Sequence, residues 1–332
     1  MRSGPARVLD ALRRAEGRVC SGEKLSADQG VSRAQIWKHV QALRDQGYAI
    51  EAAAGDGYRL AGVPDRLYPE EIAHGLETRW LARELRWLDS VDSTNRVALE
   101  LARAGAAHGA TVVAEGQTAG RGRLGRAFFS PPYLNLYSSS VLRPVLATAQ
   151  APTWILAAAC AVADAIAEEL GGADAVEIKW PNDVLLGGLK TSGILMELGA
   201  EATRVAFLVL GIGVNLNIDR AAFPEEFRAL ATSLSSHAGR RIDRVAFARR
   251  LYHRLEETLD DCARGGFAAV RPRFESRFRM PGRRVVVQEL DGSRVAGTAL
   301  GIDADGALRV LRDGGAELRV VAGDVTLVKE HA

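Results

Sequence analysis

The sequence predicts an α+β protein built from three consecutive segments, and the patterns along its 332 residues differ from one segment to the next. Residues 1–62 carry short helical patterns followed by a hairpin pattern. Residues 66–275 mix strand and helix patterns, and residues 276–330 hold short strand patterns separated by turns. A mixture of hairpins and helices is typical of α+β proteins rather than of a doubly wound sheet. We therefore expect a small helical domain, a mixed central domain and an all-β domain.

The first segment begins with three helical patterns, each ended by a glycine. The first carries Val8 and Leu12 on one face, and the second stops at Gly30. Ser32 is placed to cap the third, which has apolar residues at i, i+4 and i+7 and closes at Gly47. The periodicity therefore predicts three short helices, each with one buried face.

A hairpin pattern follows the third helix. Residues 48–51 and 58–60 flank Gly55-Asp56-Gly57, which predicts two strands and a tight turn. Three helices and a β-wing in this order resemble a winged helix-turn-helix, in which the third helix enters the major groove of DNA. The residues expected to contact DNA are Ser32, Arg33, Gln35, Trp37 and Lys38. The alternative is a helical module that docks on the rest of the chain or on another protein.

The central segment contains two clear helical patterns and several strands. Residues 94–103 and 153–170 are expected to be helical, and Gly171-Gly172 ends the longer helix. Short apolar runs predict strands at 111–115, 135–142, 177–180, 184–186, 193–198 and 205–210. Gly187-Gly188 separates two of these strands, so we expect a hairpin there.

The last segment is predicted to be all-β. Asp305-Gly306 and Asp313-Gly314 separate short apolar runs, and Asp291-Gly292 separates another pair. Asp-Gly is a strong hairpin signal because both turn residues tolerate positive φ. We expect a small SH3-like β-barrel of about five strands.

Composition limits the functions that the chain can have. With 47% hydrophobic and 25% charged residues it is typical of a globular protein with ample core. No apolar run reaches the roughly 18 residues of a membrane span, and the N-terminus begins no signal-peptide core. Three scattered cysteines indicate reduced thiols in the cytoplasm. The net charge of +2 excludes a polycation, so nucleic-acid binding must be local.

The most informative stretch is the glycine- and arginine-rich run Gly120–Arg126, the arginine loop. Its main-chain N–H groups and guanidinium groups can both bind anions. The run matches the dinucleotide-binding pattern G-x-G-x-x-G, which also requires a following helix and a carboxylate about twenty residues on. Prolines at 131 and 132 interrupt any helix, and no Asp or Glu occurs between Glu115 and Asp164. The dinucleotide interpretation is therefore excluded.

A second run, Lys179-Trp180-Pro181-Asn182-Asp183, precedes Lys190 and supplies charges of both signs. Joining a carboxylate to a nucleotide phosphate brings two anions together, so cations must offset their repulsion. The two charged runs together therefore indicate acyl or phosphoryl chemistry. The simpler interpretation is that Lys190 is an exposed hairpin lysine and Asp183 an ordinary turn residue.

Six motifs occur in an order that resembles the bifunctional biotin–protein ligase and biotin-operon repressor family. They are Asp92-Ser93-Thr94-Asn95, Glu115-Gly116-Gln117-Thr118, Gly120–Arg126, Lys179–Asp183, Lys190 with Gly193-Ile194-Leu195, and Gly211–Asn217. The resemblance implies that biotin is activated by ATP and Mg²⁺ to biotinyl-5′-AMP. Biotin would then pass to a lysine of biotin carboxyl carrier protein. It further implies repression of biotin genes at operator DNA by an adenylate-bound homodimer.

The resemblance also implies roles for individual residues. Arg121 would contact the biotin carboxylate, Arg123 would hold the adenylate, and Lys190 would bridge carboxylate and α-phosphate. Asp183 would receive or orient the acceptor lysine, and these four residues would be catalytic. The implied biotin site is Ser93, Thr94, Asn95, Gln117, Gly120, Arg121, Lys190 and Gly193. The implied nucleotide site is Arg123, Arg126, Lys179, Asn182, Gly211 and Asn215, with Asn182 and Asp183 as candidate Mg²⁺ ligands.

Two other functions share some of these features. A lipoate-type ligase has the same catalytic architecture, although the arginine loop and the Lys179–Asp183 run favour biotin. A repressor could instead use the central domain only to sense a ligand. The sequence departs from the family at Phe128, where a Trp is frequent, and at Leu124, where a basic residue is frequent. The residue that stacks on adenine within 219–230 stays open.

Overall fold

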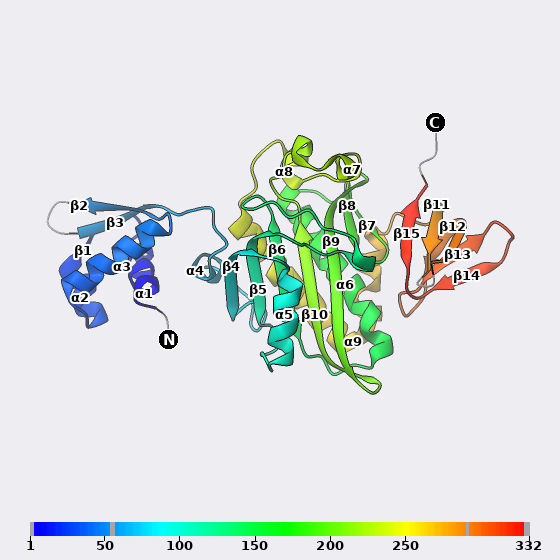
Figure 1. Ribbon diagram of the computed structural model, residues 1–332, viewed down its shortest axis with the longest axis horizontal. Helices are drawn as coiled ribbons and strands as arrows, with labels where there is room; N and C mark the ends of the chain where they lie inside the picture. Colours follow the sequence, from blue (N-terminus) through cyan, green and yellow to red (C-terminus); the bar gives the residue numbers. More distant parts are fainter. Residues whose placement is uncertain (1–2, 54–56, 290–291, 329–332) are drawn as a thin grey trace. The chain divides into compact units, whose positions relative to one another are not determined.

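The computed structural model describes residues 3–53, 57–289 and 292–328 (Figure 1). The chain forms two compact units, Met1–Arg66 and Leu67–Ala332. The predicted boundaries at 62, 66, 276 and 330 are finer than this division and remain predictions. None of the helices within the described ranges is long and apolar enough to cross a membrane.

The first unit has the predicted order of elements. Helices α1 (Gly4–Arg14), α2 (Gly22–Gln29) and α3 (Arg33–Asp45) begin at serine caps, and Gly30 ends α2 with a left-handed φ of 66°. Strands β1 (Cys20–Ser21), β2 (Ala49–Ala53) and β3 (Gly57–Gly62) form an antiparallel sheet in the order β1-β3-β2. The short strand β1 was not predicted, and Gly55 and Asp56 of the predicted turn lie outside the described residues.

The core of the second unit is a seven-stranded sheet in the order β4-β5-β6-β10-β9-β8-β7. The β4–β5 pair is parallel and the other pairs are antiparallel. The strands are β4 (Leu85–Val91), β5 (Thr111–Gln117), β6 (Leu136–Leu142), β7 (Val176–Lys179), β8 (Asp183–Leu186), β9 (Leu189–Glu201) and β10 (Arg204–Val214). This mixed sheet confirms an α+β central domain.

Helices cover both faces of the sheet because its strands are apolar on both sides. Val112 and Val209 pack with α5 (Thr94–Arg103) in one cluster. Their neighbours Val113 and Leu208 face the opposite side and belong to the main core, which contains α6 (Ala151–Leu170) and α9 (Arg244–Arg277). Side chains along a strand point alternately to the two faces of the sheet, so alternate residues of each strand pack against different helices.

Shorter elements complete the second unit. They are α4 (Pro69–Ala73), α7 (Glu225–Arg228), α8 (Leu234–Ala238), and the 3-10 turns η1 (Arg123–Gly125), η2 (Thr148–Gln150) and η3 (Arg220–Ala222). Inside α9 the helix is interrupted at Gly266, whose φ of 64° and ψ of −168° are not helical.

The C-terminal strands form a five-stranded antiparallel sheet in the order β14-β13-β12-β11-β15. They are β11 (Arg284–Gln288), β12 (Arg294–Ile302), β13 (Leu308–Arg312), β14 (Glu317–Val320) and β15 (Asp324–Leu327). The predicted strand number is confirmed, but closure into an SH3-like barrel is not. Within the described residues, β14 and β15 are edge strands that do not pair with each other.

This C-terminal sheet shares its core with the central domain. Val285 and Leu308 belong to the same buried cluster as Phe274 of α9. In addition, Trp180 donates from Nε1 to the Gly306 carbonyl at 2.9 Å. The run Lys179–Asp183 is therefore held against the C-terminal sheet.

Candidate active site

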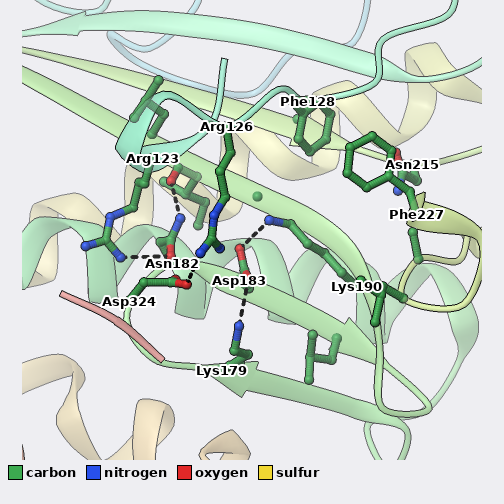
Figure 2. A pocket seen from close by; sticks show the side chains of 18 of the residues that line it. Arg123, Arg126, Phe128, Lys179, Asn182, Asp183, Lys190, Asn215, Phe227 and Asp324 are labelled. Atoms are coloured by element: carbon green, nitrogen blue, oxygen red, sulfur yellow. Dashed lines mark hydrogen bonds and ion pairs between the residues drawn. The ribbon is translucent and has the colours of Figure 1, made fainter. Parts of the chain in front are cut away.

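One cavity of about 780 Å³ is lined by all but one of the sequence-predicted site residues of the central domain. Its lining comes from the arginine loop, the Lys179–Asp183 turn, strands β9 and β10, and the C-terminal sheet (Figure 2). The predicted site residues on the lining are Ser93, Thr94, Asn95, Gln117, Arg121, Arg123, Arg126, Lys179, Asn182, Asp183, Lys190, Gly193, Gly211 and Asn215. The ligand roles implied for these residues remain predictions.

Gly120 is the one predicted ligand-site residue that does not line the cavity. A Cβ at this position would overlap the Phe128 carbonyl oxygen and lie 2.5 Å from Ser130 Oγ. The Phe128 N–H donates to the Gly120 carbonyl at 2.9 Å. The missing side chain therefore lets the two ends of the arginine loop approach each other.

The arginine loop is a short closed turn. Leu124 has a φ of 54° and Gly125 a φ of 73°, so the chain reverses through two left-handed residues. The Gly122 N–H donates to the Arg126 carbonyl at 2.6 Å. The backbones of Arg121 and Ala127 form an isolated antiparallel β-bridge. This turn spaces the three arginines along one rim of the cavity.

Two of those arginines are tied to other parts of the lining (Figure 2). Arg123 donates from Nη1 to Asn182 Oδ1 at 3.2 Å and from Nη2 to the Gly323 carbonyl at 2.7 Å. Burial lowers the pKa of Arg123, and the negative charges of Asp324 and Asp183 act against this shift. Arg126 Nη2 lies 2.7 Å from Asp324 Oδ2. The arginine loop is thus anchored to the start of β15 through Gly323 and Asp324.

Asp183 lies between two lysines. Lys190 Nζ is 2.6 Å from Oδ1, and Lys179 Nζ is 3.4 Å from Oδ2. Both contacts are ion pairs, and the one from Lys190 is the shorter. Burial opposes ionisation of Asp183, but Lys190 and Lys179 outweigh it and hold the pKa of the carboxyl below its ordinary value. Asp183 is therefore an anion enclosed by two cations.

A network of neutral polar groups forms another part of the lining. Gln117 Oε1 accepts from the Thr94 N–H at 2.9 Å and from Thr94 Oγ1 at 3.1 Å. Ser139 Oγ donates to Thr94 Oγ1 at 2.8 Å and approaches Asn95 Oδ1 at 2.6 Å. Outside this network, Asn95 donates from Nδ2 to the carboxylate Oε2 of Glu197 at 3.0 Å, and Glu197 does not line the cavity. This network suits a neutral ring that both donates and accepts hydrogen bonds.

Three glycines on β9 and β10 leave space for larger side chains. Gly211 is beside Asn95, since a Cβ there would overlap Asn95 Oδ1. Gly193 and Gly213 are cross-strand partners, and Phe128 lies against both of them. Gly211, assigned from the resemblance to the nucleotide, thus belongs with the neutral polar network.

An apolar wall follows strand β10. It consists of Phe223, Phe227, Leu230 and Ala231. Asn215 donates from Nδ2 to the Thr232 carbonyl at 3.2 Å, while its Oδ1 is buried without a hydrogen-bond partner. The wall is also bonded to the backbone of Lys190, whose N–H donates to the Leu230 carbonyl at 2.8 Å.

The two candidate Mg²⁺ ligands have a poor donor set for a metal ion. Both Asp183 oxygens face lysine ammonium groups, and Asn182 Oδ1 accepts from Arg123. No cluster of three or more His, Cys, Asp or Glu side chains exists among the described residues. Magnesium prefers one or two available carboxylates together with substrate phosphates. Asn182 and Asp183 as arranged here therefore do not fit a bound Mg²⁺.

The C-terminal sheet and the residues beside it supply lining residues that the sequence did not predict. They are Gly282, Arg283, Arg284, Asp324, Thr326, Leu327 and Val328. No motif in 276–330 marks them, because their position depends on how the sheet packs on the central domain. Phe223 and Phe227 were also unassigned, although their segment was singled out.

The expected DNA-contacting residues lie at the start and along one side of α3. Trp37 is 54% exposed, and Arg33 and Lys38 are also exposed. Ser32 Oγ accepts from the Gln35 N–H at 3.2 Å, so Ser32 caps the helix. Gln35 is half-buried and its Nε2 lies 3.4 Å from His39 Nε2. Arg33, Trp37 and Lys38 are thus the exposed side chains of this set with no capping role.

Three family models match the chain. The Biotin/lipoate A/B protein ligase family matches residues 87–215, an HTH domain matches 6–59, and the Biotin protein ligase C terminal domain matches 282–328. The fold and the cavity thus define a ligase of the biotin/lipoate type that carries an N-terminal helix-turn-helix domain.

Relatives cover nearly the whole chain. The bifunctional ligase/repressor BirA of Bacillus subtilis is 38% identical over 96% of this chain and 97% of its own length. BirA of Escherichia coli is 34% identical over 93% of each chain. The biotin protein ligase from Aquifex aeolicus, solved with biotin and ATP, gives a TM-score of 0.63. It is 28% identical over 75% of this chain and 100% of its own. The chain belongs to the biotin protein ligase family, among its bifunctional ligase/repressors.

Proposed function

We propose that the chain joins biotin to ATP, forming biotinyl-5′-AMP, and transfers biotin to a lysine of biotin carboxyl carrier protein. The observation that supports this most is the composition of one cavity. Arg121, Arg123, Arg126 and Lys190 lie on the same lining as the neutral network around Thr94 and Gln117. A cation-rich part suits carboxylate and phosphates, and a neutral polar part suits the urea-like ring of biotin.

In the first step a biotin carboxylate oxygen attacks the α-phosphorus of ATP. The bond from that phosphorus to the bridging oxygen breaks, and pyrophosphate leaves with its electron pair. Arg121, Arg123 and Lys190 offset the repulsion between the two anions and stabilise charge that develops on the phosphoryl group. Magnesium would enter with ATP, held by its phosphates.

In the second step the acceptor lysine loses a proton to solvent, and its neutral amine attacks the acyl carbon of the mixed anhydride. The bond from that carbon to the phosphate oxygen breaks, AMP leaves, and the nitrogen loses a second proton as the amide forms. Asp183, buried on the cavity lining, orients the incoming ammonium. No enzyme nucleophile is needed, because the anhydride is already activated.

The apolar wall is proposed as the adenine site. Phe227 and Leu230 offer apolar surface on the lining, and Asn215 offers a hydrogen-bond acceptor. Because Thr232 holds the amide nitrogen of Asn215, the free Oδ1 would accept from the exocyclic amino group of adenine. These assignments extend the nucleotide site beyond the motifs.

The first unit is proposed to repress biotin genes. Its helix α3 would enter the major groove, with Arg33, Trp37 and Lys38 toward DNA. One helix-turn-helix per chain implies a homodimer on a palindromic operator, which ligand binding would promote. Free Cys20, Cys160 and Cys262 agree with a reducing cytoplasm. In this scheme residues 1–62 bind DNA, 66–275 catalyse and 276–330 complete the cavity. A closed SH3-like barrel at 276–330 stays a prediction.

The test is pyrophosphate release by the purified full-length chain with ATP and Mg²⁺. Biotin should start release and lipoate should not. Release with lipoate would favour a lipoate-type ligase, and no release with either acid would favour a sensing repressor. DNA binding is tested separately with the promoter of the biotin genes. Lys38→Ala should weaken binding and reduce the salt slope by about one unit, as loss of one phosphate contact does.

A further inference from the structure

The two lysines at Asp183 reach it from opposite sides, and they are held very differently (Figure 2). Lys179 is the cross-strand partner of Asp183 in the β7–β8 pair. Lys190 comes from β9, where Asp183 pairs with Gly193 rather than with the lysine. Asp183 therefore has one counter-ion set by strand register and one brought by a long side chain from the next strand.

The backbone around Lys179 is fixed. Trp180 donates from its N–H to Met280 Sδ at 3.2 Å and from Nε1 to the Gly306 carbonyl at 2.9 Å. Asn182 donates from Nδ2 to the Ile194 carbonyl at 2.8 Å. These bonds attach the turn between Lys179 and Asp183 to the C-terminal sheet and to β9. The Lys179 side chain is 17% exposed, so its ammonium has little room to leave Asp183.

Lys190 is the more exposed of the two lysines. Its side chain is 38% exposed, against 17% for Lys179, and its Nζ lies 2.6 Å from Asp183 Oδ1. A Cβ on Gly193 would lie 3.1 Å from Lys190 Cε and 3.2 Å from Nζ. The glycine thus leaves space for the end of Lys190 beside Asp183, and Lys190 lines the cavity.

Lys179 can balance the charge of Asp183 when Lys190 moves away. Asp183 is 8% exposed, so removing its only cation would leave a buried, uncompensated anion. With Lys179 in place, one cation remains when Lys190 leaves. The two ammonium groups also repel each other, which weakens the hold of Asp183 on Lys190.

We propose that Lys179 is a positioning residue that stays paired with Asp183 while Lys190 exchanges Asp183 for the substrate anions. This inference rests on the proposed ligase function. On this proposal Lys179 acts indirectly, by pairing with Asp183 so that Lys190 can leave it. The resemblance instead implies that Lys179 contacts the nucleotide. In Lys179→Met, Lys190 would become the only lysine in contact with Asp183 and would be held there more tightly.

The first test measures pyrophosphate release with saturating biotin. Lys179→Met should lower kcat roughly tenfold or more and leave the KM for ATP unchanged. A tenfold change corresponds to the free energy of about one hydrogen bond to a charged group. Lys179→Arg should recover most of the rate, because it keeps the counter-ion. Lys179→Met with Asp183→Asn should also recover the first step, because nothing then holds Lys190. A raised KM for ATP, or no recovery in the double variant, would overturn the inference.

The second test needs no turnover. Lys190 of the ligand-free protein is labelled with an amine-reactive reagent, and the rate is followed by peptide mass spectrometry. Labelling should be slower in Lys179→Met than in the unchanged chain and faster in Lys179→Met with Asp183→Asn. Equal rates in all three proteins would overturn the inference. No pyrophosphate from the unchanged chain would instead reject the proposed function, and the labelling rates would still decide the role of Lys179.

Discussion

Arg126 and Asp324 join the arginine loop to the last C-terminal strand, with Nη2 2.7 Å from Oδ2. Next to this pair, Arg123 donates to the Gly323 carbonyl. Gly323, just before β15, and Asp324, its first residue, therefore hold two arginines of the loop. The sheet contributes to the cavity directly, and its loss would affect the loop as well as the fold.

Asp324→Ala should affect nucleotide use more than stability. Arg126 is 58% exposed, so the pair itself is worth no more than about 1 kcal/mol of unfolding free energy. We expect the KM for ATP to rise roughly fivefold, equivalent to about 1 kcal/mol, because the arginine loop loses the ion pair between Arg126 and Asp324. The KM for biotin should change little. Glu317→Ala, which breaks the exposed pair with Arg309 in the same sheet, is the matched control. Equal effects of both variants would contradict this role of Asp324.

Arg244→Met should destabilise the second unit strongly. Arg244 and Glu115 are both fully buried, with Nη1 2.8 Å from Oε2. Without its partner, Glu115 would be a buried charge, which costs about 3–5 kcal/mol. Urea unfolding should show this loss. Arg264→Met removes an exposed pair with Asp261 and should cost less than about 1 kcal/mol. A loss for Arg244→Met no larger than for Arg264→Met would show that the buried pair is not required.

Glu256 should make stability depend on acid pH. Its carboxylate accepts from the N–H groups of Arg79, Trp80 and Leu81 at 2.7 to 2.8 Å. Burial opposes ionisation, but these donors outweigh it and hold the pKa of Glu256 below its ordinary value of 4.5. A carboxyl with a depressed folded-state pKa stabilises the protein above the unfolded-state pKa. That contribution is lost as the pH falls through the lower, folded-state value.

The variant Glu256→Gln measures this contribution. The difference in unfolding free energy between the unchanged chain and Glu256→Gln should be largest near neutral pH. It should shrink as the pH falls below about 4.5. A difference that is constant from pH 7 to acid pH would assign the effect to packing and not to the charge.

Gly211→Ala should weaken biotin binding. The new Cβ would overlap Asn95 Oδ1, which lies 2.6 Å from Ser139 Oγ, so the neutral network must shift. We expect the KM for biotin to rise about tenfold or more, as for one lost hydrogen bond to a well-ordered site. The KM for ATP should change less. Gly172→Ala, where a Cβ would meet nothing within 4 Å, is the control. An increase confined to the KM for ATP would contradict this role and would support the nucleotide-binding role of Gly211 that the resemblance implies.

The local elements could be predicted because their signals lie in neighbouring residues. Serine caps and glycine stops mark α2 and α3, and Asp-Gly pairs separate C-terminal strands. The motifs also identified most of the cavity lining. The contributions of Asp324 and Gly323 could not be predicted, because they depend on long-range packing between residues far apart in the chain.

Gly120 and Gly211 show a different limit. Both are conspicuous in the sequence, and the resemblance assigned both to ligands. In the structure each lies against another protein group, Ser130 Oγ for Gly120 and Asn95 Oδ1 for Gly211. A glycine motif indicates close approach, but the sequence does not show whether a ligand or the protein itself comes close.

The most direct measurement is the amount of biotinyl-5′-AMP bound to the full-length chain after mixing with biotin, ATP and Mg²⁺. We expect one adenylate per cavity in the unchanged chain. Lys190→Ala should reduce its rate of formation roughly 10²- to 10³-fold, the usual effect of removing a transition-state cation or donor. Lys24→Ala, an exposed lysine of α2, should leave the rate unchanged. Adenylate that forms equally fast in Lys190→Ala, or none in the unchanged chain, would contradict the assignment of this cavity.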